Sequence, residues 1–366
     1  MKNETREPAI SLSPFWESCQ RAFISILAEL APNVTKRHAE IATALESIQI
    51  ESDVPVRYGP GRRARDLRAL ARAFVVKALC GYPSTKDFRL VLLADDALAS
   101  VCGFWHGVPS ESKFSRGFAR FAKLNLADIV HARLVQKHFA EAVVPHLARD
   151  SSAIEGRERP LPKPKAEPKP KGRPGRKKGV PPKPKVLTRQ ERQLTQDYKS
   201  AIDELPVLCD WGAKKNSKGA NQYWTGYKLH VDVLEDGCPL SVVLTSASVH
   251  DSQVAIPLMK MSTERVGCIF YHLMDVGYVG KSICQAAEQL DQVAIIPGKA
   301  TKTAPAIPMD PNQKRRYSLR TVVERFFSDL KDNHGGNCIR VRGHPKVRLH
   351  LMFGVLAIFA LKILAY

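Results

Sequence analysis

Four polar residues near the C-terminal end of the sequence have types and spacing that suit phosphate chemistry. At about 100° per residue of helix, Tyr317, Arg320, Glu324 and Lys331 fall within roughly a 60° arc. The other side of the same segment is apolar, with Val322, Val323, Phe326, Phe327 and Leu330. The pattern predicts a helix over 318–331 that places one carboxylate among a phenol, a guanidinium and an ammonium. An Arg–Glu ion pair on a solvated helix has the same spacing, so this cluster alone does not decide its role.

Two aspartates elsewhere could join this glutamate. Asp275 follows the apolar run 268–274 and precedes Gly277, and functional residues of open α/β sheets sit at the carboxyl ends of strands. A turn-capping aspartate would look the same. Asp150, followed by two serines, is a further candidate. Three such carboxylates could bind hard divalent cations, Mg²⁺ or Mn²⁺, through oxygen.

Other polar residues of the C-terminal half carry weaker signals. His250 and Asp251 follow a predicted strand, and a structural or substrate-positioning role is favoured for them over catalysis. His230 and Asp232 alternate with Leu229 and Val231 on another strand, which predicts that they share one face. The pattern assigns no function to this second pair.

The elements that must position these residues form an α/β pattern. Strands are expected at 223–233, 238–248, 268–274 and 292–297, with a hairpin turn at 235–237. Helices are expected at 252–261, 281–290 and 318–331. This order predicts a mixed sheet flanked by helices.

The preceding residues, 15–145, have a helical pattern. A helix over 63–80 carries Arg65, Arg68 and Arg72 beside an apolar stripe, and a second over 112–124 carries Arg116, Arg120 and Lys123. Both could be ordinary solvated faces, but two basic faces in one chain favour contact with DNA phosphates.

Composition supports a polyanionic partner. The 366 residues carry a formal charge of +20, which favours nucleic acid over an anionic membrane. Between Leu161 and Lys185 lie ten Lys or Arg and eight Pro, which predicts an unstructured basic insert at about 157–195. The insert is either a tether or a DNA-contacting arm that includes Arg173 and Arg176. The longest apolar run, 351–361, is about half a membrane span, and no secretory signal is evident. The eight dispersed cysteines indicate free thiols, and a cytoplasmic location is expected.

These features together resemble the DDE transposases of bacterial insertion sequences. Residues 317–331 match the Tyr-x2-Arg-x3-Glu-x6-Lys signature of one branch, and 226–230, 249–252 and 275–278 resemble other recurrent blocks. The resemblance covers roughly 149 to the C-terminus. It implies an RNase H-like catalytic domain at 146–366, with the basic insert, preceded by an all-α DNA-binding domain at 1–145.

The resemblance also implies a site and a reaction. Asp150, Asp275 and Glu324 would hold two Mg²⁺ or Mn²⁺ ions for DNA strand cleavage and transfer. Tyr317, Arg320 and Lys331 would contact phosphates near the transposon end. The partners would be terminal inverted repeats and target DNA, bound by a homodimer in the bacterial nucleoid. Asp150 is favoured over Asp210 as first aspartate, because a small hydroxyl residue follows it. The alternatives are a catalytically inactive, domesticated DNA-binding protein and an RNA or hybrid nuclease of the same fold.

Overall fold

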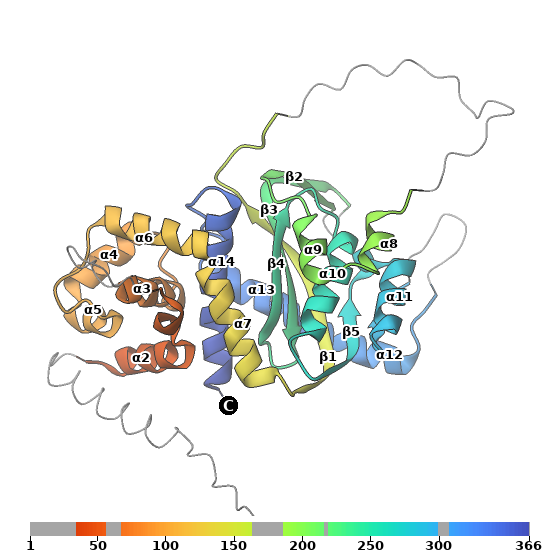
Figure 1. Ribbon diagram of the computed structural model, residues 1–366, viewed down its shortest axis with the longest axis horizontal. Coiled ribbons are helices and arrows are strands. Elements are labelled where there is room, and N and C mark those ends of the chain that lie inside the picture. The colour runs from red at the N-terminus through yellow and green to blue at the C-terminus, as the bar shows by residue number, and fades with distance from the viewer. Residues whose placement is uncertain (1–33, 56–66, 163–185, 216–218, 299–306, 366) are drawn as a thin grey trace, which may run out of the picture.

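The computed structural model describes residues 34–55, 67–162, 186–215, 219–298 and 307–365. The first part of the described chain is helical, and its helices pack at one end of the molecule (Figure 1). The elements are α2 (Lys36–Ile48), η1 (Ile50–Asp53), α3 (Leu67–Leu79), α4 (Thr85–Ala94), α5 (Asp96–Cys102), α6 (Glu111–Leu124) and α7 (Leu126–Phe139).

A mixed sheet follows directly after α7. Its strands are β1 (Val143–Glu155), β2 (Asp210–Lys215), β3 (Asn221–Leu234), β4 (Pro239–Ser246), β5 (Cys268–Met274) and β6 (Val293–Ile295). Strand β3 pairs antiparallel with β1, β2 and β4, whereas β5 lies parallel to both β1 and β6. The sheet thus runs β4-β3-β1-β5-β6, with β2 extending the hairpin at the start of β3.

The long strand β3 changes partners at Gly226. This residue pairs with Asp210 of β2 and with Glu155 of β1. Its φ of 148° is a conformation that favours glycine, and a Cβ there would lie 2.2 Å from the carbonyl oxygen of Ile154. Glycine is therefore required where three strands meet.

Helices cover both faces of the sheet. On one face lie α8 (Arg189–Gln193), α9 (Tyr198–Asp203), α10 (Ser252–Thr263) and α11 (Lys281–Gln289). The other face is covered by α13 (Thr321–Asp332), which packs on β1 and β3 and is preceded by α12 (Pro311–Tyr317) and η3 (Ser318–Arg320). The short η2 (Val276–Tyr278) follows β5. This mixed α/β arrangement is consistent with an RNase H-like domain.

The last helix, α14 (His344–Ile363), joins the two parts of the molecule. Figure 1 shows it between the helical region and the sheet, and it packs against α2, α3, α6 and α7 as well as α13 and β4. One continuous hydrophobic core includes Phe74 of α3, Phe353 of α14 and Val231 of β3. Within the described residues, no helix combines the length and the apolar character that a membrane crossing needs.

The structure confirms the expected mixed α/β class and most of its elements. The strand expected at 268–274 is β5, and the expected helix 318–331 begins with one 3₁₀ turn before α13. One difference concerns the middle of the chain. Residues 163–185 of the basic insert lie outside the described residues, but the expectation of an unstructured insert up to 195 is wrong at Arg189–Gln193. A capping box formed by Thr188 and Glu191 starts helix α8 there.

Candidate active site

Two aspartates lie side by side at the centre of the sheet. Arg149 of β1 is the register partner of Met274, the last residue of β5, so Asp150 lies next to Asp275, which directly follows that strand. Neighbouring strands are about 4.8 Å apart. Burial raises the pKa of the Asp150 carboxyl, and the nearby charge of Asp275 raises it further. The two carboxylates therefore repel each other.

Arg320 connects Asp150 to the glutamate of α13. Its Nη1 donates to Asp150 Oδ2 at 2.9 Å, across 170 residues of sequence, and its Nη2 donates to Glu324 Oε1. The side chain of Arg320 is 15% exposed, that of Asp150 23% and that of Glu324 54%, so the cluster opens to solvent on the glutamate side. The apolar side of α13, with Val323, Phe326, Phe327 and Leu330, is buried.

The remaining residues of the spaced set lie along the same surface. The Arg320 guanidinium lies 5.7 Å from the ring centre of Tyr317. Burial raises the pKa of the Tyr317 phenol, while Arg320 acts to lower it. Lys331 lies two turns further along α13, where burial and the nearby Lys214 of β2 lower its pKa. The row thus runs from the aspartates toward the β2–β3 hairpin.

The opposite face of β1 carries a closed polar network behind the aspartates. Arg149 donates to both carboxylate oxygens of Asp232, at 2.6 and 2.7 Å. Ser151 donates to Asp251 at 2.7 Å, and Lys228 lies 3.1 Å from the same oxygen. Asp251 therefore anchors the start of α10 to β1, which agrees with a structural or positioning role.

The histidines of this region differ in their surroundings. His230 is fully buried and bonded to Thr245 at 3.0 Å, and burial lowers its pKa to about 3. His250 is exposed and lies 2.8 Å from the hydroxyl of Ser252. Neither ring reaches the cluster around Arg320 through a direct contact.

Asp210, the alternative first aspartate, lies away from Asp275. It is the first residue of β2 and shares the register of Glu155, five residues along β1 from Asp150. At about 3.3 Å per residue, this register offset corresponds to roughly 16 Å. The structure therefore brings Asp150, not Asp210, next to Asp275 and Arg320.

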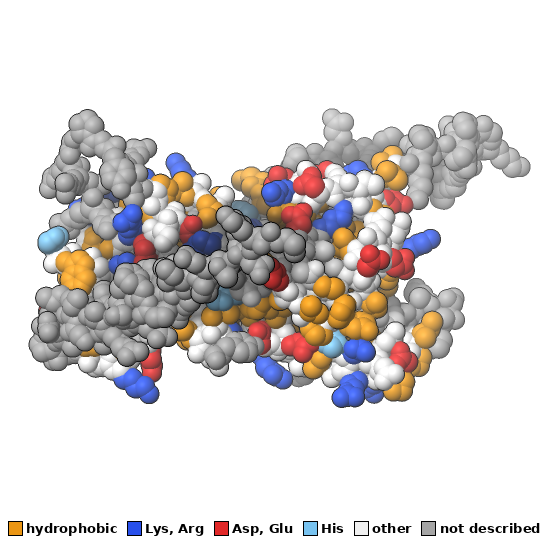
Figure 2. All heavy atoms as spheres, turned by 60° about the horizontal axis from the view of Figure 1, so that its bottom comes forward, with side chains coloured by type: hydrophobic (Ala, Val, Ile, Leu, Met, Phe, Trp, Pro, Cys, Tyr) orange, Lys and Arg blue, Asp and Glu red, His pale blue; other side chains and the backbone are white. Residues whose placement is uncertain are grey.

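The basic residues expected to contact DNA have different environments. On α6, Arg116 and Lys123 are exposed and Arg120 is half-buried. On α3, Arg72 donates to Glu51 at 2.7 Å, and Arg68 is exposed but has an interaction partner. Arg65, Arg173 and Arg176 lie outside the described residues. On the described part of the face shown in Figure 2, basic and acidic side chains are interspersed.

The donor set can be compared with what a divalent cation needs. No group of three His, Cys, Asp or Glu residues lies close enough to hold a metal ion in the described part of the chain. Asp150 and Asp275 supply adjacent, mutually repelling oxygen donors, which suit a hard cation. The guanidinium of Arg320 lies between Glu324 and Asp150 and donates to both. The donor types therefore fit a cation at the two aspartates, whereas Glu324 is separated from them by the Arg320 guanidinium.

Comparison with known sequences identifies the family. The sequence model of a family described as transposase DDE domain matches residues 146–360. The chain belongs to this transposase family. No curated protein matches the chain. The match includes Asp150, Asp275 and Glu324, and membership implies transposase activity on DNA.

For some residues of this DDE domain, the sequence gives no sign of the structural role that they have in the fold. Arg149 is one of several polar residues in β1, and its fully buried pairing with Asp232 depends on strands that are far apart in the chain. The link between Ser151 and Asp251 is equally remote in sequence. Alternation on β3 does place His230 and Asp232 on one face, as expected.

Proposed function

We propose that this transposase binds the ends of an insertion sequence and catalyses metal-dependent strand cleavage and strand transfer, as a member of the Tyr-Arg-Glu-Lys branch with an RNase H-like domain. The observation that carries the proposal is the convergence on Arg320. A guanidinium of the spaced set is bonded to both Asp150 of β1 and Glu324 of α13, beside Asp275. An ordinary surface ion pair would involve only the helix.

Asp150, Asp275 and Glu324 are the proposed ligands of two Mg²⁺ or Mn²⁺ ions. When bound, such ions activate an attacking oxygen and stabilise the leaving oxygen of a phosphodiester. The protein contributes the fixed spacing of the two aspartates on adjacent strands and the third carboxylate on α13. The Arg149–Asp232 pair holds β1 in place from behind.

Arg320 has a second proposed role as a phosphate ligand. Its Nε is buried and lacks a hydrogen-bond partner among the described residues. A guanidinium with one unused N–H group can donate to a phosphate oxygen, and its two parallel N–H groups match the spacing of phosphate oxygens. We infer that a DNA phosphate draws Arg320 away from Glu324 and frees that carboxylate. Tyr317 and Lys331 extend the phosphate-binding row.

The proposed partners are terminal inverted repeats and target DNA. Joining two transposon ends requires at least a dimer on DNA, and the nucleoid is the proposed location. Residues 1–145 are the proposed DNA-binding domain, with Arg116, Arg120 and Lys123 of α6 as described candidates for phosphate contact. The net charge of +20 supports a polyanionic partner.

The deciding experiment compares Asp150→Asn with Asp210→Asn. DNA carrying the element's ends is cut in Mg²⁺ at matched DNA occupancy, and EDTA serves as the metal-free control. We expect Asp150→Asn to abolish cleavage with end binding retained, and Asp210→Asn to cut nearly as wild type. Cleavage by Asp150→Asn with loss in Asp210→Asn would reverse the assignment. A wild-type protein that binds ends without cutting them would favour an inactive, domesticated DNA-binding protein.

A further inference from the structure

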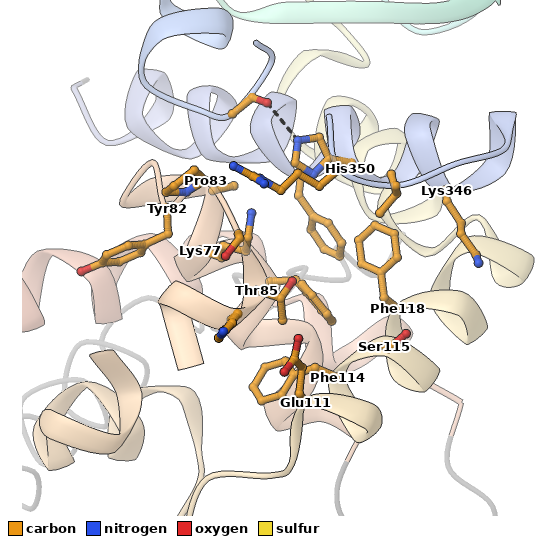
Figure 3. A pocket seen from close by; sticks show the side chains of 18 of the residues that line it. Lys77, Tyr82, Pro83, Thr85, Glu111, Phe114, Ser115, Phe118, Lys346 and His350 are labelled. Atoms are coloured by element: carbon orange, nitrogen blue, oxygen red, sulfur yellow. Dashed lines mark hydrogen bonds between the residues drawn. The ribbon is translucent and has the colours of Figure 1, made fainter. Parts of the chain in front are cut away.

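A cavity lies at the junction of the helical region and α14. Its volume is about 450 Å³, and no residue of β1 or β5 is among those that line it. Its walls come from α3, the start of α4, α6, the segment before α14 and α14 itself. Figure 3 shows Lys77, Phe114, Phe118 and His350 around it. Concave sites of several hundred Å³ are typical of ligand binding.

The cavity is lined by the largely buried Lys77, a cation with no pairing partner among the described residues. Lys77 of α3 is only 8% exposed, yet its side chain lines the cavity and makes neither an ion pair nor a hydrogen bond with any described residue. Burying a charge without a partner is costly, so such a group is expected to meet an anion. In Figure 3 its nitrogen points into the space between α3 and His350.

The rest of the lining combines cations with aromatic rings. Four further basic residues line the cavity, against one acidic residue, Glu111. These basic residues are Lys86, Arg340, Arg342 and Lys346. The inner wall carries Phe74, Phe114, Phe118 and Phe353, whose rings pack edge-to-face or stacked on one another, with Phe74 5.0 Å from Phe118 and 5.6 Å from Phe353. Phe118 is the most accessible of the four at 8% exposed, so a base on this wall would lie mainly over Phe118.

We propose that this cavity binds one nucleotide unit, with its phosphate on Lys77 and the arginines and its base against the phenylalanine wall. Inorganic phosphate alone would use the cations and leave the aromatic wall and most of the volume unfilled. Bases stack on aromatic side chains without strong sequence preference, and guanidinium and ammonium groups bind phosphate. The nucleotide is either free in solution or a unit unstacked from a DNA strand.

Direct binding to the full-length protein tests the proposal. Calorimetry with a deoxynucleoside monophosphate should show one site, and inorganic phosphate should bind at least about tenfold more weakly. Lys77→Met keeps the length of the side chain and should weaken nucleotide binding by about tenfold or more. The matched control Lys137→Met, on the exposed side of α7, should bind as wild type. Equal affinity in wild type and Lys77→Met would overturn the proposal.

A second variant and a second probe complete the test. Ser115→Trp places an indole at the exposed edge of the cavity and should block nucleotide binding with an unchanged circular dichroism spectrum. Retained binding in this variant would contradict the site. To separate the sources, duplex DNA with 2-aminopurine is added. If the 2-aminopurine fluorescence increases, and if this increase is lost in Lys77→Met and reversed by added monophosphate, the ligand is a unit of DNA. If the monophosphate binds but the fluorescence does not increase, the ligand is a free nucleotide.

The binding should also depend on pH. Burial lowers the pKa of Lys77 to about 8, with Arg340 lowering it and Cys338 and Asp87 raising it. The other titratable or charged groups that line the cavity are Tyr82, Lys86, Glu111, His334, Arg340, Arg342, Lys346 and His350. Affinity for the monophosphate should fall from about pH 7 to about pH 9.5, because the ammonium loses its proton there while the phosphate stays doubly charged. An affinity that is constant over this range would exclude Lys77 as the phosphate ligand.

The DNA source rests on the proposed function, but the calorimetric test does not. Nucleotide binding should be unchanged in Asp150→Asn, which removes only the proposed catalytic carboxylate. A protein that cuts DNA but binds no monophosphate would overturn the cavity proposal alone. A protein that binds monophosphate but cuts no DNA would overturn the catalytic proposal alone.

Discussion

Two arginine–carboxylate clusters lie on opposite faces of strand β1, and their differences separate a structural site from a reactive one. Arg149 and Asp232 are 0% exposed and joined by two hydrogen bonds, and Ser262 donates to the same carboxylate at 2.6 Å. Arg320 instead divides its donors between Asp150 and Glu324, and the glutamate is half exposed. Both clusters pair an arginine with carboxylates. They differ in how deeply the side chains are buried and in whether the arginine donors all have partners.

This contrast indicates what each cluster can do. The Arg149 cluster has no access for a ligand, so it can only fix β1, β3 and α10 relative to one another. The Arg320 cluster borders solvent and has a donor unused by the described residues, so a phosphate or cation can exchange with its present partners. Loss of the first should cost stability, and loss of the second should cost activity.

The largest effect is expected for Glu324→Gln. The change keeps the side-chain volume but removes a proposed metal ligand, so strand cleavage should fall about 10⁴-fold, equivalent to roughly 5 kcal/mol in activation free energy. Thermal stability should change little, because Glu324 is 54% exposed. Cleavage rates in Mg²⁺ and a melting curve measure both quantities. Glu288→Gln, on the exposed surface of α11, is the control and should cut normally. Wild-type cleavage by Glu324→Gln would reduce the Arg320 cluster to a surface ion pair.

The opposite result is expected for Asp232→Asn. Breaking one side of a buried ion pair leaves the Arg149 charge uncompensated, which costs about 3–5 kcal/mol of unfolding free energy. Denaturant titration measures this loss. The double variant Arg149→Met with Asp232→Leu should recover much of the stability, because no unpaired charge is left. If Asp232→Asn is as stable as wild type but cannot cleave, the buried pair belongs to the catalytic machinery.

The sequence predicts the elements of this fold better than their contacts. The apolar run at 268–274 and the apolar side of the helix at 321–332 identify β5 and α13, because an apolar run or a helix face is a local property of the sequence. The fixed spacing of Tyr317, Arg320 and Glu324 likewise identifies the candidate site. The choice between Asp150 and Asp210 is not local, because it depends on which strand pairs with β5.

Long-range packing accounts for what the sequence does not reveal. Nothing near Lys77 indicates a cavity, because its walls are contributed by helices separated by more than 200 residues. The apolar run 351–361 is evident in the sequence, but its position between the helical region and the sheet depends on the faces of several helices at once. Pairings such as Arg149 with Asp232 have the same origin.

Acid should destabilise the fold through buried histidines, including two in the sheet. Burial lowers the pKa of His230 to about 3 and that of His272 to about 4. Both rings are neutral in the folded state, and above about pH 6.5 they are also neutral in the unfolded state. As the pH falls below 6.5, only the unfolded chain takes up protons, so each ring costs about 1.4 kcal/mol of stability per pH unit until its folded pKa is reached. His272→Gln should flatten the slope by this amount, whereas the exposed His106→Gln should not; equal slopes in both would refute a buried neutral His272.

The smallest effect concerns the two basic helices. It tests whether the difference between solvent-accessible and already paired arginines also holds in the helical region. Arg116 and Lys123 of α6 are exposed, whereas Arg72 of α3 is already paired with Glu51. Each phosphate contact contributes about 0.9 to the log–log salt slope of DNA binding. Replacing Arg116 and Lys123 by Ala should therefore lower the slope by about 2, with stability unchanged. Arg72→Ala should leave the slope as it is and cost about 1 kcal/mol of stability, as expected for a partly exposed ion pair. Anisotropy titrations of end DNA at several salt concentrations measure the slopes. If Arg72→Ala flattens the slope and the α6 double variant leaves it unchanged, then α3 contacts DNA and its ion pair opens on binding.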